Sequence, residues 1–237
     1  MKATAIILAA GIGKRMKSNR PKQYLALNGV PILTRTLSAF DDHPEINAII
    51  LVAADKDISF IHGSVLAGKK WKTNITVTAG GSRRQDSVLE GLKAARGLTG
   101  DDDIVLVHDG VRPFVTRELI TACISGAVEA GACIPGIPAS DTLKRIDERD
   151  RVTATVARES IRLVQTPQAF LFRLLREGFE HAVAQNLSVT DDAGVIEAMG
   201  LPVKIVPGNP MNMKITTPED LAVAEALLGN ELPGTGT

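Results

Sequence analysis

The chain has 237 residues, of which 44% are hydrophobic and 23% charged, and its 27 Lys and Arg residues balance 27 Asp and Glu residues. This composition is typical of a globular protein with one large domain or two small ones. Nucleic-acid-binding proteins usually carry a basic excess, so the net charge of zero argues against that class. It still allows a local basic pocket for phosphate.

The cysteines and the N-terminus exclude further classes. Cys123 and Cys133 form no CxxC pair and no Cys/His cluster, so neither a zinc site nor a disulfide framework is expected. We expect both to be small buried hydrophobic side chains. The apolar run at residues 5–8 is too short to span a membrane and leads into a glycine-rich loop rather than a signal-peptide cleavage site. These features predict a cytoplasmic protein that binds no membrane.

Short apolar runs rich in β-branched residues alternate with helical patterns along the first part of the chain. Strands are predicted at residues 5–8, 48–52 and 104–107, and more weakly at 75–77 and 132–134. Helices are predicted at 87–96 and 116–130. This order is typical of βαβ units, and it predicts a Rossmann-like α/β fold with a doubly wound, mostly parallel sheet.

The alternation breaks at residues 141–159, a charged segment in which Thr and Val alternate after Arg151. It predicts a two-stranded excursion with its turn near residues 148–151. A lone hairpin has little to bury by itself. It is therefore either a solvated flap or, as we favour, a β-arm that packs on a second subunit.

Regular elements resume after the arm. Helices are predicted at residues 171–185 and 191–199, a strand at 203–206, and a last helix from Glu219, where Pro218 favours a helix start. These elements predict a single domain over residues 1–229. The Gly/Pro/Thr-rich residues 230–237 predict a flexible tail, which could also be a linker to a further domain.

A glycine-rich loop follows the first predicted strand, at the sheet edge where such folds bind ligands. Gly11 and Gly13 allow the backbone to approach a phosphate, while Arg15 and Lys22 add positive charge. The dinucleotide pattern GxGxxG fails because Met16 stands where its third glycine should be, and no GxxxxGK[ST] string is present. The loop is thus neither of the two common phosphate-binding types.

Two more strings follow predicted strands. The paired glycines of AGGSRRQDSV, residues 79–88, open a helix and could hold an anion. In VHDGVRP, residues 107–113, Asp109 is a carboxylate at a strand end and a natural Mg²⁺ ligand beside a bound phosphate, whereas His108 is given no catalytic role. The acidic triplet at 101–103 precedes its strand, at the wrong edge for a ligand, and is interpreted as a solvated turn.

These strings, taken in order with later ones, resemble the 2-C-methyl-D-erythritol 4-phosphate cytidylyltransferase family. The matching segments are AAGIGKRM with PKQY, AGGSRRQDSV, VHDGVRP, ASDTLK with VAR, QTPQAF, VTDDA, and NMKIT with PEDL, which together extend from residue 9 to residue 221. The sequence departs from the family pattern at Gly110 and Val111, where two alanines are usual, and at Asp192, where Glu is usual.

The resemblance implies transfer of CMP from CTP to 2-C-methyl-D-erythritol 4-phosphate, with release of pyrophosphate, in isoprenoid precursor synthesis. It implies that Arg15 and Lys22 are catalytic, stabilising charge at the α-phosphorus. It implies that Gly81 and Ser87 read the cytosine. The implied nucleotide site consists of Ala9, Ala10, Gly11, Gly13, Gly81, Arg84 and Ser87.

The implied acceptor site consists of Asp109, Arg112, Thr142, Arg158, Thr166, Thr190 and Lys214, and the implied cofactor is Mg²⁺ at Asp109. Thr142 and Arg158 belong to the arm and would reach the site of a neighbouring subunit in a homodimer. Arg158 and Lys214 suit an acceptor phosphate chemically. That phosphate is itself the nucleophile, so no side-chain base is required.

Three other readings remain open. A ribitol 5-phosphate cytidylyltransferase would share most of these strings, and its difference lies in the shape of the acceptor. A sugar-phosphate nucleotidylyltransferase for another base is disfavoured by the segment from Gly81 to Ser87. A non-catalytic nucleotide-binding regulator would be expected to lack Arg15, Lys22 or Asp109, and all three are present.

Overall fold

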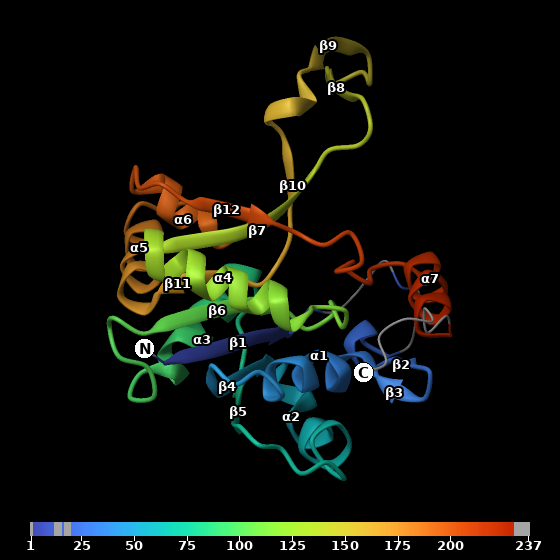
Figure 1. Ribbon diagram of the computed structural model, residues 1–237, viewed down its shortest axis with the longest axis vertical. Coiled ribbons are helices and arrows are strands. Elements are labelled where there is room, and N and C mark those ends of the chain that lie inside the picture. The colour runs from blue at the N-terminus through green and yellow to red at the C-terminus, as the bar shows by residue number, and fades with distance from the viewer. Residues whose placement is uncertain (1, 12–15, 17–19, 230–237) are drawn as a thin grey trace.

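The computed structural model describes residues 2–11, 16 and 20–229. Within them, eight strands form one sheet in the order β10-β7-β11-β6-β1-β4-β5, with β12 also paired to β7 (Figure 1). The strands are β1 Ala3–Ala9, β4 Ile46–Ala53, β5 Asn74–Ala79, β6 Ile104–Asp109, β7 Ala132–Pro138, β10 Arg162–Val164, β11 Gln168–Leu171 and β12 Lys204–Pro207. A two-stranded pair, β2 Ala26–Leu27 and β3 Val30–Pro31, lies outside the sheet.

Parallel pairing dominates the sheet. Strands β6, β1, β4 and β5 run parallel, and so do β12 and β7. Strand β11 lies antiparallel between β6 and β7, and β10 is antiparallel to β7. The expected Rossmann-like, mostly parallel fold is confirmed, and the two antiparallel strands are additions that the sequence patterns did not predict.

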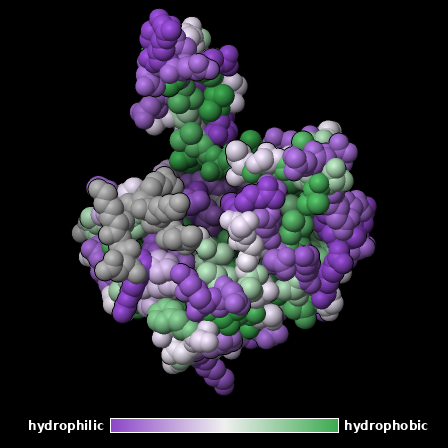
Figure 2. Space-filling model, turned by 180° about the vertical axis from the view of Figure 1, so that it is seen from behind, coloured by the Kyte–Doolittle hydropathy of each residue, from purple (hydrophilic) through white to green (hydrophobic). Residues whose placement is uncertain are grey.

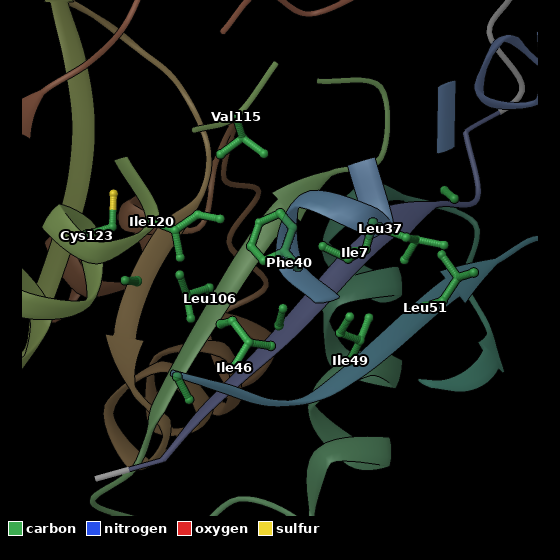
Figure 3. Packing of buried hydrophobic residues seen from close by; sticks show 14 of the residues in the cluster. Ile7, Leu37, Phe40, Ile46, Ile49, Leu51, Leu106, Val115, Ile120 and Cys123 are labelled. Carbon is green, nitrogen blue, oxygen red and sulfur yellow. The ribbon is translucent and has the colours of Figure 1, made fainter. Parts of the chain in front are cut away.

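Helices cover both faces of the sheet, which is why its central strands are apolar throughout. One face packs on α1 Ile32–Asp41 and α4 Arg117–Ala130, and the other on α3 Arg84–Ala95, α5 Phe172–Ala184 and α6 Ala193–Ala198. Adjacent residues of β1 divide between the two cores, Ile7 with the first and Ile6 with the second. Figure 3 shows Phe40 of α1 lying over this sheet beside Ile7.

Four predicted helices are confirmed with small shifts of their ends, those at residues 87–96, 116–130, 171–185 and 191–199. Helix α7, Pro218–Gly229, begins one residue before the predicted start at Glu219. Helix α1 and the short helical turns between β4 and β5, which include α2 Ile58–Phe60, were not predicted. In α1 the β-branched Thr34 and Thr36 weaken the helical signal although Phe40 and its apolar neighbours are buried.

The arm is an antiparallel hairpin of β8 Leu143–Ile146 and β9 Val152–Val156 that protrudes from the body (Figure 1). Its turn closes with the Asp147 amide donating to the Arg151 carbonyl at 3.0 Å, as predicted. Ile146 and Val152 are 54% and 61% exposed. The arm therefore presents apolar side chains that nothing in this chain covers in the described structure.

The expectations for the two cysteines and for the acidic triplet also hold. Cys123 and Cys133 are buried free thiols in the core. The acidic triplet is a turn before β6, in which Asp103 accepts hydrogen bonds from the Lys2 and Gly100 amides. No helix among the residues that the structure describes is long and apolar enough to cross a membrane.

The register of the central strands aligns their carboxyl-terminal ends. Ala9 of β1 pairs with Ala53 of β4, which pairs with Ala79 of β5, and Leu8 pairs with Asp109 at the end of β6. The loops after these strands therefore meet at one edge of the sheet. This is the carboxyl edge, at which open α/β sheets bind their ligands.

Candidate functional site

A pocket of about 900 Å³ opens at this carboxyl edge. That size is in the range of small-molecule and cofactor sites. It is lined by Leu8, Ala9, Ala10, Gly11, Lys22, Gln23, Ala54, Asp55, Lys56, Gly80, Gly81, Ser82, Arg83, Arg84, Ser87, Asp109, Val111 and Lys214. Figure 2 shows the face of the molecule below the arm, where the surface is hollowed.

One wall of the pocket is the glycine pair after β5. The Gly81 amide donates to the Ser87 hydroxyl at 3.2 Å, and this hydroxyl lies 3.2 Å from the Arg83 carbonyl to which it donates. A Cβ placed on Gly80 would lie 2.8 Å from the Ser87 hydroxyl oxygen and 2.9 Å from the Ala10 Cβ. Only a glycine lets this loop pack so closely on the end of β1.

Lys22 also lines the pocket and begins a 3-10 turn, Lys22–Tyr24, after the first glycine loop. Its ammonium donates to the Ile215 carbonyl at 3.1 Å. The next residue, Gln23, is buried and donates to the Ala9 carbonyl at 2.6 Å, which fixes the turn against the end of β1. Gly13 and Arg15 lie outside the described residues.

Asp109 lines the pocket, and three cationic side chains surround its carboxylate. Its carboxylate lies 2.9 Å from the Lys214 ammonium, 3.4 Å from the Arg112 Nε and 3.9 Å from the Arg84 Nε. Burial alone would raise the pKa of Asp109, but Lys214, Arg84 and Arg112 together hold it well below its usual range. The carboxylate is therefore ionised, and the cluster retains an excess of positive charge suited to phosphate.

Arg84 lines the pocket, but its guanidinium pairs with Asp192 at distances of 2.8 and 2.6 Å. The Asp192 side chain is fully buried at the start of α6. Burial would lower the pKa of Arg84, yet the carboxylate of Asp192 raises it. Arg84 thus joins α3 to α6 beside Asp109, and a contact with the nucleotide stays a prediction.

Arg112 and Thr166 contact Asp109 without lining the pocket. The Thr166 hydroxyl accepts from the Asp109 amide at 3.1 Å, and Arg112 donates to the Asn212 carbonyl at 2.7 Å. The neighbouring His108 is completely buried, and burial lowers its pKa to about 4. His108 is consequently neutral near pH 7.

Three predicted acceptor residues do not reach the pocket of their own chain. Thr142 and Arg158 belong to the arm region, where the Arg158 guanidinium donates to the Ser140 carbonyl. Thr190 is exposed on the loop before α6. The structure therefore groups the predicted nucleotide residues that it describes and places Arg112 and Thr166 against Asp109, but it leaves these three apart.

Several pocket residues were not predicted. Asp55 and Lys56 come from the loop after β4, and Val111 comes from the loop after β6. Open α/β sheets bind ligands at the loops that follow their strands. Because residues 48–52 were recognised as a strand, this rule would also have indicated Asp55 and Lys56.

The donor set decides how a Mg²⁺ ion could be held here. Among the described residues no group of three or more His, Cys, Asp or Glu side chains could hold a metal ion. Asp109 offers one carboxylate, whose Oδ2 already contacts Lys214 and Arg112. Mg²⁺ commonly binds one or two carboxylates plus phosphate oxygens and water. The residues would fit an ion held mainly by the substrate's phosphates, with the Asp109 carboxylate as its ligand from the described part of the chain.

A mostly parallel sheet with a glycine-lined pocket and fixed cations at its carboxyl edge is typical of the class of α/β proteins that bind nucleotides. Comparison with known proteins identifies the particular family. Residues 3–230 match the family described as 2-C-methyl-D-erythritol 4-phosphate cytidylyltransferase. The chain belongs to this family.

Individual relatives match over nearly the whole chain. A 2-C-methyl-D-erythritol 4-phosphate cytidylyltransferase of Syntrophus aciditrophicus is 42% identical over 97% of this chain and 97% of its own length. The crystal structure of a 4-diphosphocytidyl-2C-methyl-D-erythritol synthase from Anaerococcus prevotii is 36% identical, covers 96% of both chains and has a TM-score of 0.84. A bifunctional IspD/IspF enzyme of Desulfotalea psychrophila is 46% identical, and the match covers 96% of this chain and 57% of the relative.

Proposed function

We propose that this chain transfers CMP from CTP to 2-C-methyl-D-erythritol 4-phosphate, forming 4-diphosphocytidyl-2-C-methyl-D-erythritol and pyrophosphate. The observation that carries the proposal is the pocket itself, which is lined by Gly80 and Gly81 together with Lys22 and the Asp109 cluster. Near-complete similarity to this family over residues 3–230 supports the same reaction.

The chemistry requires a charged pocket rather than a side-chain base. An oxygen of the acceptor phosphate, already anionic near neutral pH, attacks the α-phosphorus of CTP. The bond from this phosphorus to the bridging oxygen of pyrophosphate breaks, and pyrophosphate leaves with the electron pair. Catalysis of this kind consists of positioning and charge stabilisation.

Each part of the pocket has a role in this reaction. Gly81 and Ser87, with Ala9 and Ala10, form the wall for the cytosine, and Lys22, with Arg15, stabilises charge on the triphosphate. Lys214 and Arg112, held by Asp109, bind the acceptor phosphate. Asp109 would hold a Mg²⁺ ion, which would supply further charge neutralisation at the triphosphate when bound.

The acceptor site is completed by a second subunit. The arm carries Thr142 and Arg158 away from the pocket of its own chain and exposes Ile146 and Val152. In a homodimer the second subunit covers these apolar side chains of the arm, and the arm brings Thr142 and Arg158 to the neighbouring pocket. The two free, buried cysteines are in keeping with a cytoplasmic location, where disulfides are rare.

Removal of the arm tests this arrangement. A chain in which residues 142–157 are replaced by a two-glycine turn is expected to be monomeric and to lose acceptor turnover, because the dimer contact and Thr142 are lost and Arg158 is no longer carried to the neighbouring pocket. Light scattering, turnover and CTP titration measure the three properties, and CTP binding should persist. Glu148→Ala, at the exposed tip, is the control and should behave as wild type. A dimeric, active deletion variant would show that the arm has neither role.

The glycine wall makes a separate prediction. Gly80→Ala forces a Cβ to within 3 Å of Ser87 and Ala10, so the base pocket must shift. Overpacking of this kind costs about 1–3 kcal/mol, and we expect CTP binding about tenfold weaker by calorimetry. Gly63→Ala is the matched control, since a Cβ there meets nothing within 4 Å. Equal CTP affinity in both variants would remove this wall from the nucleotide site.

The function itself is tested by pyrophosphate release from CTP and Mg²⁺ with one acceptor at a time. Release with 2-C-methyl-D-erythritol 4-phosphate but not with ribitol 5-phosphate is the expected result, and chelation of Mg²⁺ should abolish it. Release only with ribitol 5-phosphate would keep the nucleotide site and overturn the acceptor. CTP binding without release from either acceptor would indicate a regulator.

A further inference from the structure

A buried hydrogen-bond chain runs beneath the pocket through a residue that the reaction does not use. The Asp109 amide donates to the Thr166 hydroxyl at 3.1 Å, and this hydroxyl lies 3.0 Å from the His108 Nδ1. On the other side of the ring, His108 Nε2 lies 3.2 Å from the Arg112 carbonyl. One imidazole therefore connects both ends of the segment that carries Asp109 and Arg112.

The hydrogen-bond partners of His108 determine which of its ring nitrogens carries the hydrogen. A carbonyl can only accept, so Nε2 must carry the proton that is donated to Arg112. Because neutral imidazole carries one N–H, Nδ1 must be the acceptor, and the Thr166 hydroxyl donates to it while accepting from the Asp109 amide. Complete burial of the ring against Phe40, with centroids 4.9 Å apart, favours this neutral form.

The segment that the ring holds is a tight turn. The Arg112 amide donates to the Asp109 carbonyl at 3.1 Å, which closes the turn over residues 109–112. Asn212, on a third segment, closes this hydrogen-bond network. Its backbone carbonyl accepts from the Arg112 guanidinium at 2.7 Å, and its side-chain amide donates to the Thr166 carbonyl at 2.8 Å. Rotation of any member breaks a buried hydrogen bond, which costs about 1–3 kcal/mol.

We propose that His108 is a positioning residue for the transfer reaction, which holds Asp109 and Arg112 at the acceptor side of the pocket through Thr166 and the Arg112 carbonyl. The inference rests on the proposed function. A misplacement of about 1 Å costs roughly 100-fold in rate when reacting groups must be aligned. The loss should fall on the acceptor, because the ring contacts the turn that carries acceptor residues and not the glycine wall that faces the nucleotide.

His108→Leu removes both ring contacts, and Thr166→Val removes the hydroxyl but keeps the shape. We expect both to lower kcat/KM for the acceptor about 10- to 100-fold, with the Kd for CTP changed less than about twofold. Thr166→Ser restores the hydroxyl and should recover most of the loss. His108→Asn, which offers an acceptor near the Nδ1 position alone, should recover part of it. If His108→Leu does not fold, the Thr166 pair carries the same test.

The matched control is Thr4→Val, which removes another buried hydroxyl, bonded to Thr99 at 2.8 Å at the opposite edge of the same sheet. It should lower Tm by a similar amount and leave kcat/KM unchanged. If the His108 and Thr166 variants lower Tm but keep acceptor kcat/KM within about twofold of this control, the role of the ring is only structural and the proposal is overturned.

A measurement independent of turnover is the ¹⁵N spectrum of the histidine rings, with His108 assigned by its loss in His108→Asn. A protonated Nε2 and an unprotonated Nδ1 are expected, and a protonated Nδ1 would overturn the proposal whatever the activity. Wild-type protein that shows the expected tautomer but does not turn over 2-C-methyl-D-erythritol 4-phosphate would contradict the proposed function instead.

Discussion

We expect Lys22→Ala to lower kcat by about 100- to 1,000-fold, which corresponds to about 3–4 kcal/mol of barrier. Lys22 lines the pocket with a positive charge, which we propose contacts the triphosphate. This charge acts on negative charge that develops as the pyrophosphate leaves, so the loss should appear in kcat more than in the KM for CTP. Steady-state pyrophosphate release at saturating CTP and acceptor measures it.

The Lys22 side chain also has a structural contact, so stability must be measured separately. Its bond to the Ile215 carbonyl is worth about 1 kcal/mol, and a small fall in Tm is expected. Lys72→Ala is the control, because Lys72 pairs with Asp42 at the surface with 72% of its side chain exposed. A Lys22→Ala enzyme with kcat within about threefold of wild type would exclude Lys22 from the chemical step.

Asp109→Asn is expected to have the second large effect, on stability and turnover together. The neutral amide leaves Lys214, Arg112 and Arg84 without their shared carboxylate. Removing one member of a buried ionic group costs about 3–5 kcal/mol, and we expect a loss of this size in the free energy of unfolding. Acceptor turnover should fall at least about 100-fold, since Arg112 and Lys214 no longer hold their positions.

The pH dependence of this loss follows from the sign of the pKa shift. The pKa of Asp109 is lower in the folded protein than the value of about 3.9 in an unfolded chain. Its ionised form therefore stabilises the fold fully above about pH 4, and the contribution is lost as the pH falls through the folded pKa. The stability gap between wild type and Asp109→Asn should be constant from pH 6 to 8, within about 0.5 kcal/mol, and should narrow below about pH 4.

Denaturant unfolding at each pH measures this gap. Asp101→Asn is the control, because Asp101 lies at the other edge of the sheet and pairs with Arg176 across 3.5 Å with most of its side chain exposed. It should change stability by less than about 1 kcal/mol. A gap for Asp109→Asn as small as that of the control would mean that the three cations do not depend on this carboxylate.

Local sequence patterns predicted the parts of the fold that depend on near neighbours. The runs at residues 5–8, 48–52 and 104–107 became β1, β4 and β6 because a strand buried on both faces must be apolar throughout. The arm was recognised for the opposite reason, since its charged, alternating sequence cannot fill a core. These features need only the period of the chain and the identity of adjacent residues.

Strand order was not readable from the same patterns. Strand β11 enters between β6 and β7, although α4 alone separates those two strands along the chain. Its four residues, Gln168–Leu171, are too few to give a clear period. Their place is decided by packing against both neighbours, with Phe170 and Ala169 in opposite cores, which is a property of the assembled sheet.

The sequence by itself determined that glycine-rich loops follow the parallel strands, because strand ends and glycine strings are both local features. Only the tertiary structure decided which charges pair within the site. Arg84 and Asp192 are 108 residues apart along the chain, and Asp109 meets Lys214 and Thr166 from two further segments. The sequence did not indicate the role of His108 for the same reason. The protonation of each ring nitrogen depends on its hydrogen-bond partner, and these partners, Thr166 and Arg112, are brought to the ring only by folding. Such pairings depend on close packing between segments that are distant in the sequence, so the periodicity of the chain does not predict them.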